Sequence, residues 1–176
     1  MKHRLIDQDQ FITTAVGVNL RYIEVGSGDC TLLLVPGWTM SAEVFEHQFE
    51  HYENSSTFRC IAFDPRSHGR SSKPSSGHTY ADHGQDIAAF IQALNLDNIV
   101  LAGWSFGTLA ALAYVNQSGS EKLSGLIMLD GPPRALGADN QTDWVTYRHD
   151  DADGLQAFYT YHRLTNPEST NSSFVE

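Results

Sequence analysis

Short apolar runs alternate with longer amphipathic segments along most of the chain, and this alternation restricts the fold more than any other feature of the sequence. The apolar runs have the length of strands and occupy residues 31–35, 58–63, 98–102 and 123–129. Such runs are typical of strands buried on both faces of a parallel sheet. Because the intervening segments are long enough for right-handed crossovers, the sequence predicts an α/β protein with a mostly parallel sheet flanked by helices.

Helical periodicity in the intervening segments agrees with this prediction. Aromatic residues recur at helical spacing over residues 45–52 and give one apolar face, and Ser41 is placed to cap that helix, with Glu43 in its first turn. Residues 80–94 predict a second amphipathic helix, and helix-forming residues follow Ser105. Each of these helices lies between two of the apolar runs, as crossover helices do.

The chain begins with a different pattern. Residues 11–16 and 19–25 predict two short strands joined near Gly17, and the alternation in the second strand suits a half-buried antiparallel hairpin. Residues 64–77 are polar and rich in turn formers, so they predict a long loop.

Composition limits the class of protein. The chain has 176 residues, of which 41% are hydrophobic and 18% charged, so it can build the core of at most one ordinary domain. Its formal net charge of −10 leaves no surplus of Lys and Arg for phosphates, which argues against nucleic acid as a partner. The N-terminus has no apolar segment typical of a signal peptide, and no run is long enough to cross a bilayer. We therefore expect a cytoplasmic protein that does not contact membranes.

The residues that could bind a metal do not form a convincing set. Cys30 and Cys60 lack the CxxC spacing, so they predict neither a zinc site nor a disulfide framework. His47 and His51 share one helix face, but no acidic or cysteine ligand accompanies them, and a solvated face is the better interpretation. No metal site is predicted.

The segment Gly103-Trp-Ser-Phe-Gly107 lies between an apolar run and a predicted helix. A bare Gly-x-Ser-x-Gly is weak evidence, but this context is where a nucleophile elbow lies. The two glycines are needed there because the strand and the helix approach too closely for side chains. The helix N-terminus, with its free N–H groups, points toward the serine. Ser105 is therefore a candidate nucleophile.

A second segment, Pro36-Gly37-Trp38, ends the apolar run at residues 31–35. The backbone N–H of Trp38 could pair with that of Phe106 to hold a developing oxyanion. Removing one donor of this kind typically costs about 3–4 kcal/mol of transition-state stabilisation. Trp38 and Phe106 are thus the candidate oxyanion-hole residues.

Three segments together resemble the α/β-hydrolase superfamily: Pro36-Gly37-Trp38, Asp64-Pro-Arg-Ser-His-Gly-Arg-Ser71 and Gly103-Trp-Ser-Phe-Gly107. Within it, the chain looks most like small carboxylesterases and the cofactor-free haloperoxidase-like hydrolases. The resemblance covers residues 11–133 and implies chemistry without a metal or other cofactor. The motifs are specific for the fold and much less specific for the substrate.

The resemblance is not complete. Pro36, Ser67 and Thr108 stand where the family often has His, Gly and Gly, which blurs the subfamily. Because the family's triad follows the order Ser, acid, His, Asp130 after the run at residues 123–129 matches a less common position of the acid. The alternative is a polar residue that merely ends a strand.

No histidine can be assigned to the usual position of the triad base. His68 belongs to a loop motif that is mainly structural in the family. His149 and His162 lie in the last part of the chain, where a substrate-facing or exposed position suits them better. The resemblance therefore implies that this chain carries the nucleophile without the base.

The resemblance divides the chain into two parts. Residues 1–133 would be the N-terminal part of a hydrolase core, and residues 134–176 the beginning of a truncated helical cap, helical over residues 138–161. Half of a parallel sheet would expose an unpaired strand edge and apolar side chains. We expect little or no triad-type turnover from such a chain.

The implied activity of an intact parent protein is hydrolysis of a small carboxylic ester or lactone through an acyl-enzyme on Ser105. One alternative is a cofactor-free haloperoxidase or perhydrolase on the same fold. Another is a ligand-binding protein that has no catalytic activity. The substrate and the oligomeric state are left open.

Overall fold

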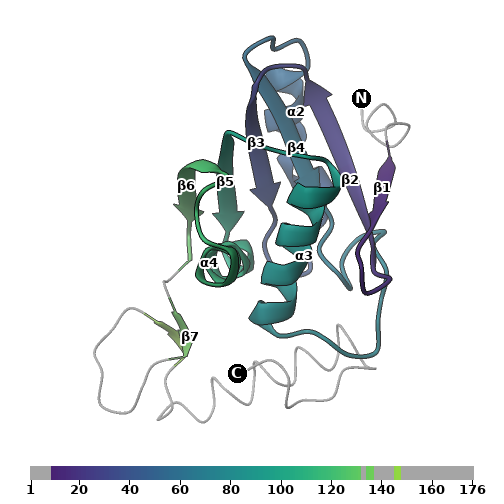
Figure 1. Cartoon of the computed structure of the whole chain (residues 1–176), viewed down its shortest axis with the longest axis vertical. Coiled ribbons are helices and arrows are strands. Elements are labelled where there is room, and N and C mark those ends of the chain that lie inside the picture. Colours follow the sequence, from purple (N-terminus) through teal and green to yellow (C-terminus); the bar gives the residue numbers. More distant parts are fainter. Residues whose placement is uncertain (1–8, 132–133, 137–144, 148–176) are drawn as a thin grey trace.

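The computed structural model describes residues 9–131, 134–136 and 145–147, and most of them belong to one six-stranded sheet with helices on both faces (Figure 1). The strand order in this sheet is β1-β2-β4-β3-β5-β6. The strands are β1 (Gln10–Thr13), β2 (Asn19–Gly26), β3 (Cys30–Val35), β4 (Phe58–Phe63), β5 (Ile99–Trp104) and β6 (Leu123–Leu129). The helical elements are η1 (Ala42–Phe45), α2 (Glu46–Tyr52), α3 (Tyr80–Ala93) and α4 (Phe106–Ser118).

Strand pairing confirms the predicted architecture. Strands β4, β3, β5 and β6 are parallel to one another, whereas β1 pairs with β2 and β2 pairs with β4 in antiparallel register. The apolar runs identified in the sequence form the parallel strands, and the N-terminal hairpin supplies the antiparallel edge. The sheet is thus mixed and mostly parallel, as the alternation of runs predicts.

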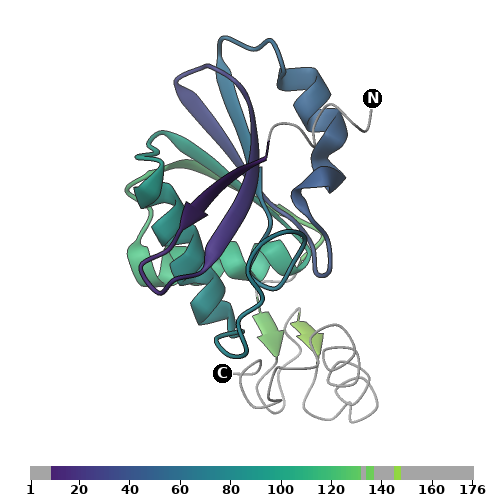
Figure 2. The same cartoon turned by 90° about the vertical axis from the view of Figure 1, so that its right-hand side faces the viewer.

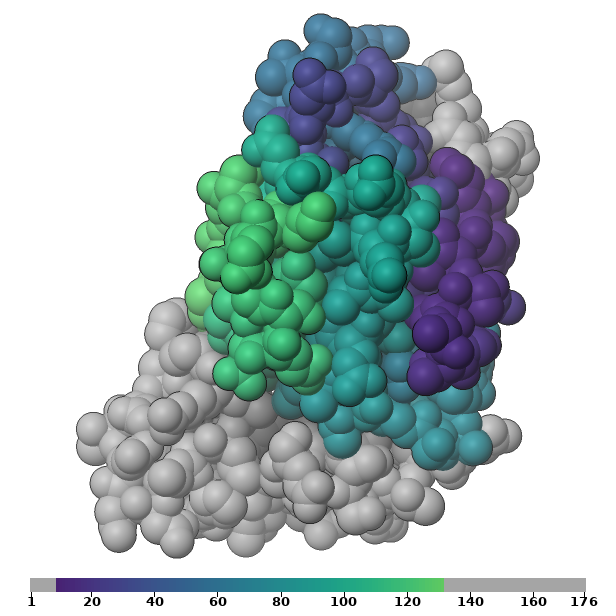
Figure 3. Space-filling model, in the orientation of Figure 1, coloured from purple at the N-terminus to yellow at the C-terminus, as the bar shows by residue number. Residues whose placement is uncertain are grey.

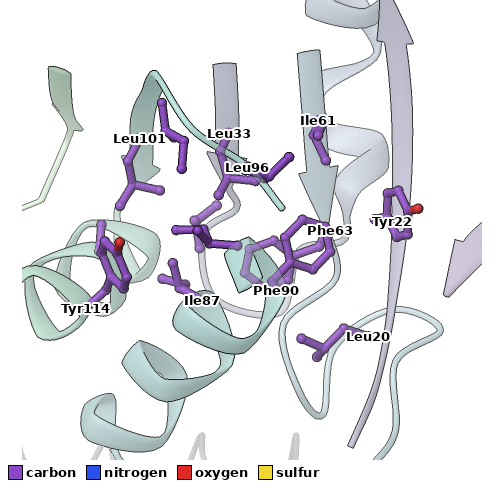
Figure 4. Packing of buried hydrophobic residues seen from close by; sticks show 14 of the residues in the cluster. Leu20, Tyr22, Leu33, Ile61, Phe63, Ile87, Phe90, Leu96, Leu101 and Tyr114 are labelled. Atoms are coloured by element: carbon purple, nitrogen blue, oxygen red, sulfur yellow. The ribbon is translucent and has the colours of Figure 1, made fainter. Parts of the chain in front are cut away.

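Helices cover the two faces of the sheet separately, as Figures 1 and 2 show. Helices α3 and α4 pack on one face, where Phe90 of α3 stacks on Phe63 of β4 at a centroid distance of 4.9 Å (Figure 4). On the other face Phe45 and Phe49, from η1 and α2, pack against Leu34 of β3 and its neighbours. Both faces of the central strands are therefore buried, which explains why their sequences are continuously apolar.

Strand β2 differs from the sequence prediction. A half-buried strand is predicted, whereas β2 lies between β1 and β4 and is buried on both faces. Its Arg21 side chain is fully buried, where it forms ion pairs with Asp9, Glu43 and Asp64. The alternating pattern misled the prediction because a buried guanidinium is tolerated when carboxylates neutralise it.

The predicted helix cap at Ser41 is also wrong. The Ser41 hydroxyl is hydrogen-bonded to the carboxylate of Glu43 and caps no backbone N–H. Instead, the Ala42 N–H donates to Oδ1 of Asp64, at 2.7 Å, from the end of β4. A tertiary contact therefore replaces the local cap that the sequence suggested.

The part of the chain after residue 133 contains two short described strands. β7 (Arg134–Leu136) and β8 (Val145–Tyr147) pair in parallel with each other. Since residues 138–161 are predicted to be helical, the prediction is wrong at β8, where two β-branched residues and a tyrosine favour a strand. The remainder of that predicted helix lies outside the described residues.

Strand β6 forms one edge of the sheet, opposite β1 (Figure 3, green and purple). Its side chains Leu126, Ile127, Met128 and Leu129 are 37–45% exposed. Because consecutive residues of a strand point to opposite faces, apolar surface is exposed on both sides of β6. An open edge with such side chains favours association with other strands.

We expect the chain to self-associate through β6 and the substitution Ile127→Lys to reduce this association, because a lysine on an edge strand opposes edge-to-edge pairing. Light scattering during gel filtration over a range of concentrations measures the effect. Ser124→Thr is the matched control, since it changes an exposed polar residue of the same strand without adding a charge. A wild-type chain that stays monomeric at every concentration would contradict the expectation.

Candidate active site

Ser105 occupies a strained turn between β5 and α4. Its backbone has φ +52° and ψ −115°, and it directly precedes the first residue of α4, Phe106. A non-glycine residue at positive φ costs of the order of 1–3 kcal/mol and persists only where the surroundings enforce it. The Ser105 N–H donates to the carbonyl of Leu129 at the end of β6, at 2.7 Å, and the Ser105 carbonyl accepts from Thr108 N–H, at 2.9 Å. Bonds on both sides thus hold the turn.

The glycines on either side of Ser105 lie where no side chain fits. A Cβ on Gly103 would overlap the carbonyl of Gly107, and a Cβ on Gly107 would overlap the carbonyl of Val35 at the end of β3. The start of α4 is therefore in backbone contact with two parallel strands at once. Only glycine allows this approach without displacing main chain.

The loop after β3 lies directly against Ser105. A Cβ on Gly37 would lie 3.6 Å from the Ser105 Cβ and 3.4 Å from the ring of Trp104, both ordinary contact distances. Trp38 follows Gly37, and the Met40 N–H donates back to the Gly37 carbonyl at 3.1 Å, which closes a turn. The segment that carries the Trp38 N–H is thus adjacent to the Ser105 side chain.

Phe106 is the first residue of α4, so its N–H has no partner within the helix. The same end of α4 carries the positive pole of the helix dipole. Ser105, Trp38 and Phe106, which the sequence analysis singles out separately, therefore come together at the carboxyl edge of the sheet.

Thr108 braces the turn from inside the helix. Its side chain is fully buried, and its hydroxyl donates to the Gly103 carbonyl at 2.9 Å. The bond joins the first turn of α4 to the end of β5, on the two sides of Ser105. Sequence reasoning treats Thr108 only as a departure from a frequent glycine, although a hydroxyl at the start of an apolar helix is a signal that it has a buried partner.

The predicted loop between β4 and α3 is present, but several of its polar side chains are buried. Asp64 is fully buried and accepts from the backbone N–H groups of Ala42 and Arg70, both at 2.7 Å. Arg66 forms a two-pronged ion pair with Asp86 of α3, at 2.6 and 2.7 Å. These pairs fix a loop that composition alone describes as solvent-exposed.

Three rings enclose the side chain of Phe106. His68 stacks on it, with centroids 5.6 Å apart and 23° between the planes. His83 meets it edge-on at 4.8 Å, and Tyr80 lies tilted at 5.5 Å. The rings come from the loop after β4 and from α3, so sequence spacing gave no signal of this cluster.

The protonation state of His68 follows from its contacts. Its Nδ1 lies 2.8 Å from the carbonyl oxygen of Arg66, which can only accept, so Nδ1 carries the proton. Burial lowers the pKa of His68 below its ordinary value, and the ring is neutral. Burial likewise lowers the pKa of His78. The other nitrogen of His68, Nε2, is buried and accepts no hydrogen bond from the described residues.

The candidate acid and base are not assembled in the described part of the chain. Asp130 is exposed, has φ +50°, and follows the residue whose carbonyl binds the Ser105 N–H. Its carboxylate forms no hydrogen bond or ion pair with a described residue, and none of them hydrogen-bonds to the Ser105 hydroxyl. His149 and His162 lie outside the described residues.

The cysteines and the candidate metal ligands lie apart from this site. Cys30 and Cys60 are both free, and burial raises the pKa of the Cys60 thiol to about 12. Over the described residues, no group of three or more potential metal ligands is found, and no helix has the length and apolar character to cross a membrane.

Comparison with known proteins gives consistent matches. A family model described as alpha/beta hydrolase fold matches residues 31–167. A non-heme chloroperoxidase of Streptomyces lividans is 31% identical over 134 residues, which is 75% of this chain and 48% of the relative. A bifunctional esterase/perhydrolase of Acinetobacter calcoaceticus is 26% identical over 135 residues, 76% of this chain and 49% of the relative.

Among solved structures, an esterase from Exiguobacterium antarcticum superimposes with a TM-score of 0.75 at 29% sequence identity. The match covers 88% of this chain and 56% of the esterase. The chain therefore spans about half the length of the curated relatives that it matches.

We expect the free energy of unfolding to fall as the pH drops from about 7.5 to about 5.5. The unfolded chain protonates His68 and His78 near their ordinary pKa of about 6.5, whereas burial lowers the pKa of both side chains in the folded chain. Stability from these groups is complete above that pKa and is lost below it. Chemical unfolding at several pH values measures the slope. Burial raises the pKa of Asp64 and Asp86, and these carboxyls act in the opposite direction.

The variant His68→Phe should flatten part of this slope, whereas His47→Phe should not, since the His47 side chain is 83% exposed and is paired with the exposed carboxylate of Glu50. Equal slopes in all three proteins would show that His68 does not titrate with folding.

The substitution Thr108→Val should lower the free energy of unfolding by about 1–2 kcal/mol, because it removes a buried hydrogen bond while nearly keeping the shape of the side chain. The urea midpoint measures the change. Thr57→Val serves as the matched control, because Thr57 is exposed, and it should change stability by no more than about 0.5 kcal/mol. A Thr108→Val protein as stable as wild type would mean that the hydroxyl does not brace the elbow.

Proposed function

The chain belongs to the alpha/beta hydrolase family, and from this premise we propose that its whole protein is a serine hydrolase that cleaves a small carboxylic ester or lactone through an acyl-enzyme on Ser105. The observation that carries the proposal is the strained backbone of Ser105 at the junction of β5 and α4. The cost of that conformation has a simple explanation if the turn presents the hydroxyl to a substrate.

The proposed reaction begins when Oγ of Ser105 attacks the carbonyl carbon while a general base takes the hydroxyl proton. The carbonyl electron pair moves to oxygen, and the resulting oxyanion accepts hydrogen bonds from the N–H groups of Trp38 and Phe106. When the tetrahedral intermediate collapses, the alkoxide leaves and takes the proton from the base. Water then attacks the acyl-enzyme by the same steps, which releases the carboxylic acid and frees Ser105.

The roles in this scheme rest on position. Gly103 and Gly107 permit the close approach of strand and helix, and Gly37 brings the Trp38 segment against Ser105. Asp130 is our candidate for the acid that would orient the base, because it leaves β6 beside the elbow. The base itself is a histidine that we do not assign to any described residue, and no metal or cofactor takes part in the proposed steps.

A second candidate function has specific support from the relatives. One is named a non-heme chloroperoxidase and another a bifunctional esterase/perhydrolase. In perhydrolysis, hydrogen peroxide would replace water in the second half of the reaction, and its oxygen would attack the acyl-enzyme to give a peracid and free Ser105. The same nucleophile and oxyanion donors serve both outcomes, so the fold does not separate them.

We expect the chain of residues 1–176 to react stoichiometrically and slowly with a fluorophosphonate, forming a phosphorus–oxygen bond at Ser105 and releasing fluoride. Because no described residue is assigned as the base, we expect only the contribution of the oxyanion hole to remain, about 10³–10⁴-fold over water in well-studied hydrolases. Intact mass and peptide mapping identify the modified residue. Ser105→Ala should not be labelled, and turnover of a p-nitrophenyl ester by the wild-type chain should stay close to background.

Three other outcomes are informative. Labelling elsewhere, or none at all, would remove Ser105 as the nucleophile. Rapid ester turnover that Ser105→Ala abolishes would keep Ser105 but place the base within these residues. Stoichiometric binding of an ester without any covalent product would favour a ligand-binding protein on the hydrolase fold, and peracid formation with hydrogen peroxide would favour the perhydrolase.

A further inference from the structure

The ring of Phe106 is buried among aromatic rings from other elements, although Phe106 is the first residue of its helix. It is 8% exposed and in contact with His68, Tyr80 and His83, none of which belongs to its own helix. The backbone N–H of the same residue is the proposed oxyanion donor from α4. A side chain fixed in this way fixes the peptide unit attached to it.

His68 is the member of this ring cluster that packs face to face with Phe106, at 5.6 Å and 23°. Its own ring is oriented by the bond from Nδ1 to the Arg66 carbonyl, at 2.8 Å. Arg66 in turn is anchored to α3 through the paired bonds to Asp86. A continuous series of contacts therefore runs from α3 through the loop after β4 to the elbow.

One of the two ring nitrogens of His68 is buried at a cost to the stability of the fold. The ring is 8% exposed, yet Nε2 accepts no hydrogen bond from the described residues. A buried acceptor without a partner typically costs about 1–3 kcal/mol. The compensating features are the stacking of the ring on Phe106, which a phenylalanine would also supply, and the bond from Nδ1 to the Arg66 carbonyl, which it would not.

We propose that His68 is a positioning residue: its imidazole, stacked on Phe106, fixes the backbone N–H of Phe106 in the oxyanion hole next to Ser105. This inference rests on the proposed function of Ser105. His68 touches neither substrate nor reacting atoms in this proposal and acts only through the Phe106 ring. A flat ring at position 68 is required, whereas its second nitrogen is not.

The ionisable groups around His68 affect the same contact. Asp64 favours a charged imidazole, while Lys73 and His78 oppose it; the backbone carbonyl of Arg66 accepts from Nδ1, and the His83 ring lies edge-on with its centroid 6.4 Å away. Protonation would add a buried N–H donor at Nε2, and burial makes the charged form costly. The elbow should therefore loosen in acid when position 68 is a histidine and stay unchanged when it is a phenylalanine.

The test compares His68→Leu, which removes the ring face, with His68→Phe, which keeps it. Two readouts are made on the full chain: the second-order rate of fluorophosphonate labelling at Ser105, and backbone hydrogen exchange in the peptide that spans residues 101–112. We expect His68→Leu to lower the labelling rate by about 2- to 10-fold, the range that one aromatic pair is worth, and to speed exchange in that peptide. His68→Phe should restore both values, and its exchange should lose the acid dependence seen in wild type.

The control is His47→Leu, which removes an exposed imidazole paired with the exposed carboxylate of Glu50, and it should match wild type in both readouts. If His68→Leu fails to fold, the comparison of wild type with His68→Phe across pH still decides the matter. A Phe106→Leu variant adds a further check, because combining it with His68→Leu should give no additional effect if both act through one contact.

Two results would overturn the inference. The first is a folded His68→Leu protein with wild-type labelling and exchange. The second is a His68→Phe protein as impaired as His68→Leu, or with the acid dependence of wild type. If wild type itself is not labelled at Ser105, the proposed function fails, whereas the exchange measurements still test whether His68 fixes the elbow.

Discussion

The close approach of β3, β5 and the start of α4 is the constraint on which the rest of this structure depends. A Cβ on Gly107 would overlap the carbonyl of Val35, and a Cβ on Gly103 would overlap the carbonyl of Gly107, so three main-chain segments meet without side chains between them. Ser105 accepts a positive φ because the strand and the helix are both fixed before and after it. The strain of the turn is thus supported by the parallel sheet on one side and by α4 on the other.

The elbow is also joined to more distant parts of the chain. Thr108 connects α4 to β5, and the ring cluster around Phe106 connects α4 to α3 and to the loop after β4. Asp64 holds that loop in place, because its carboxylate accepts hydrogen bonds from the N–H of Ala42 in η1 and from the N–H of Arg70 in the loop. Elements that are far apart in the sequence therefore stabilise one turn, and each uses buried polar groups that have specific partners.

Much of this could be predicted from the sequence, for physical reasons that are specific. Continuous apolar runs predict strands buried on both faces, and the glycines around Ser105 predict close backbone contact at a turn between strand and helix. Local patterns are a poor guide where long-range pairing replaces a local preference. Arg21 breaks the pattern of an inner strand because carboxylates from three segments neutralise it, and Asp64 replaces Ser41 as the cap of η1.

The contacts of the elbow also show which parts of a hydrolase site can be built by this half of the relatives' length. The proposed nucleophile Ser105 and the segments with both proposed oxyanion donors depend on backbone geometry between β3 and α4, and the structure describes all of that geometry. Asp130, our candidate acid, directly follows β6 and forms no hydrogen bond or ion pair with a described residue. The Ser105 N–H is bonded to Leu129 of that same strand, whose outer edge is unpaired among the described strands. A partner that covers the exposed side of β6 would therefore lie on the strand whose Leu129 carbonyl holds the Ser105 N–H.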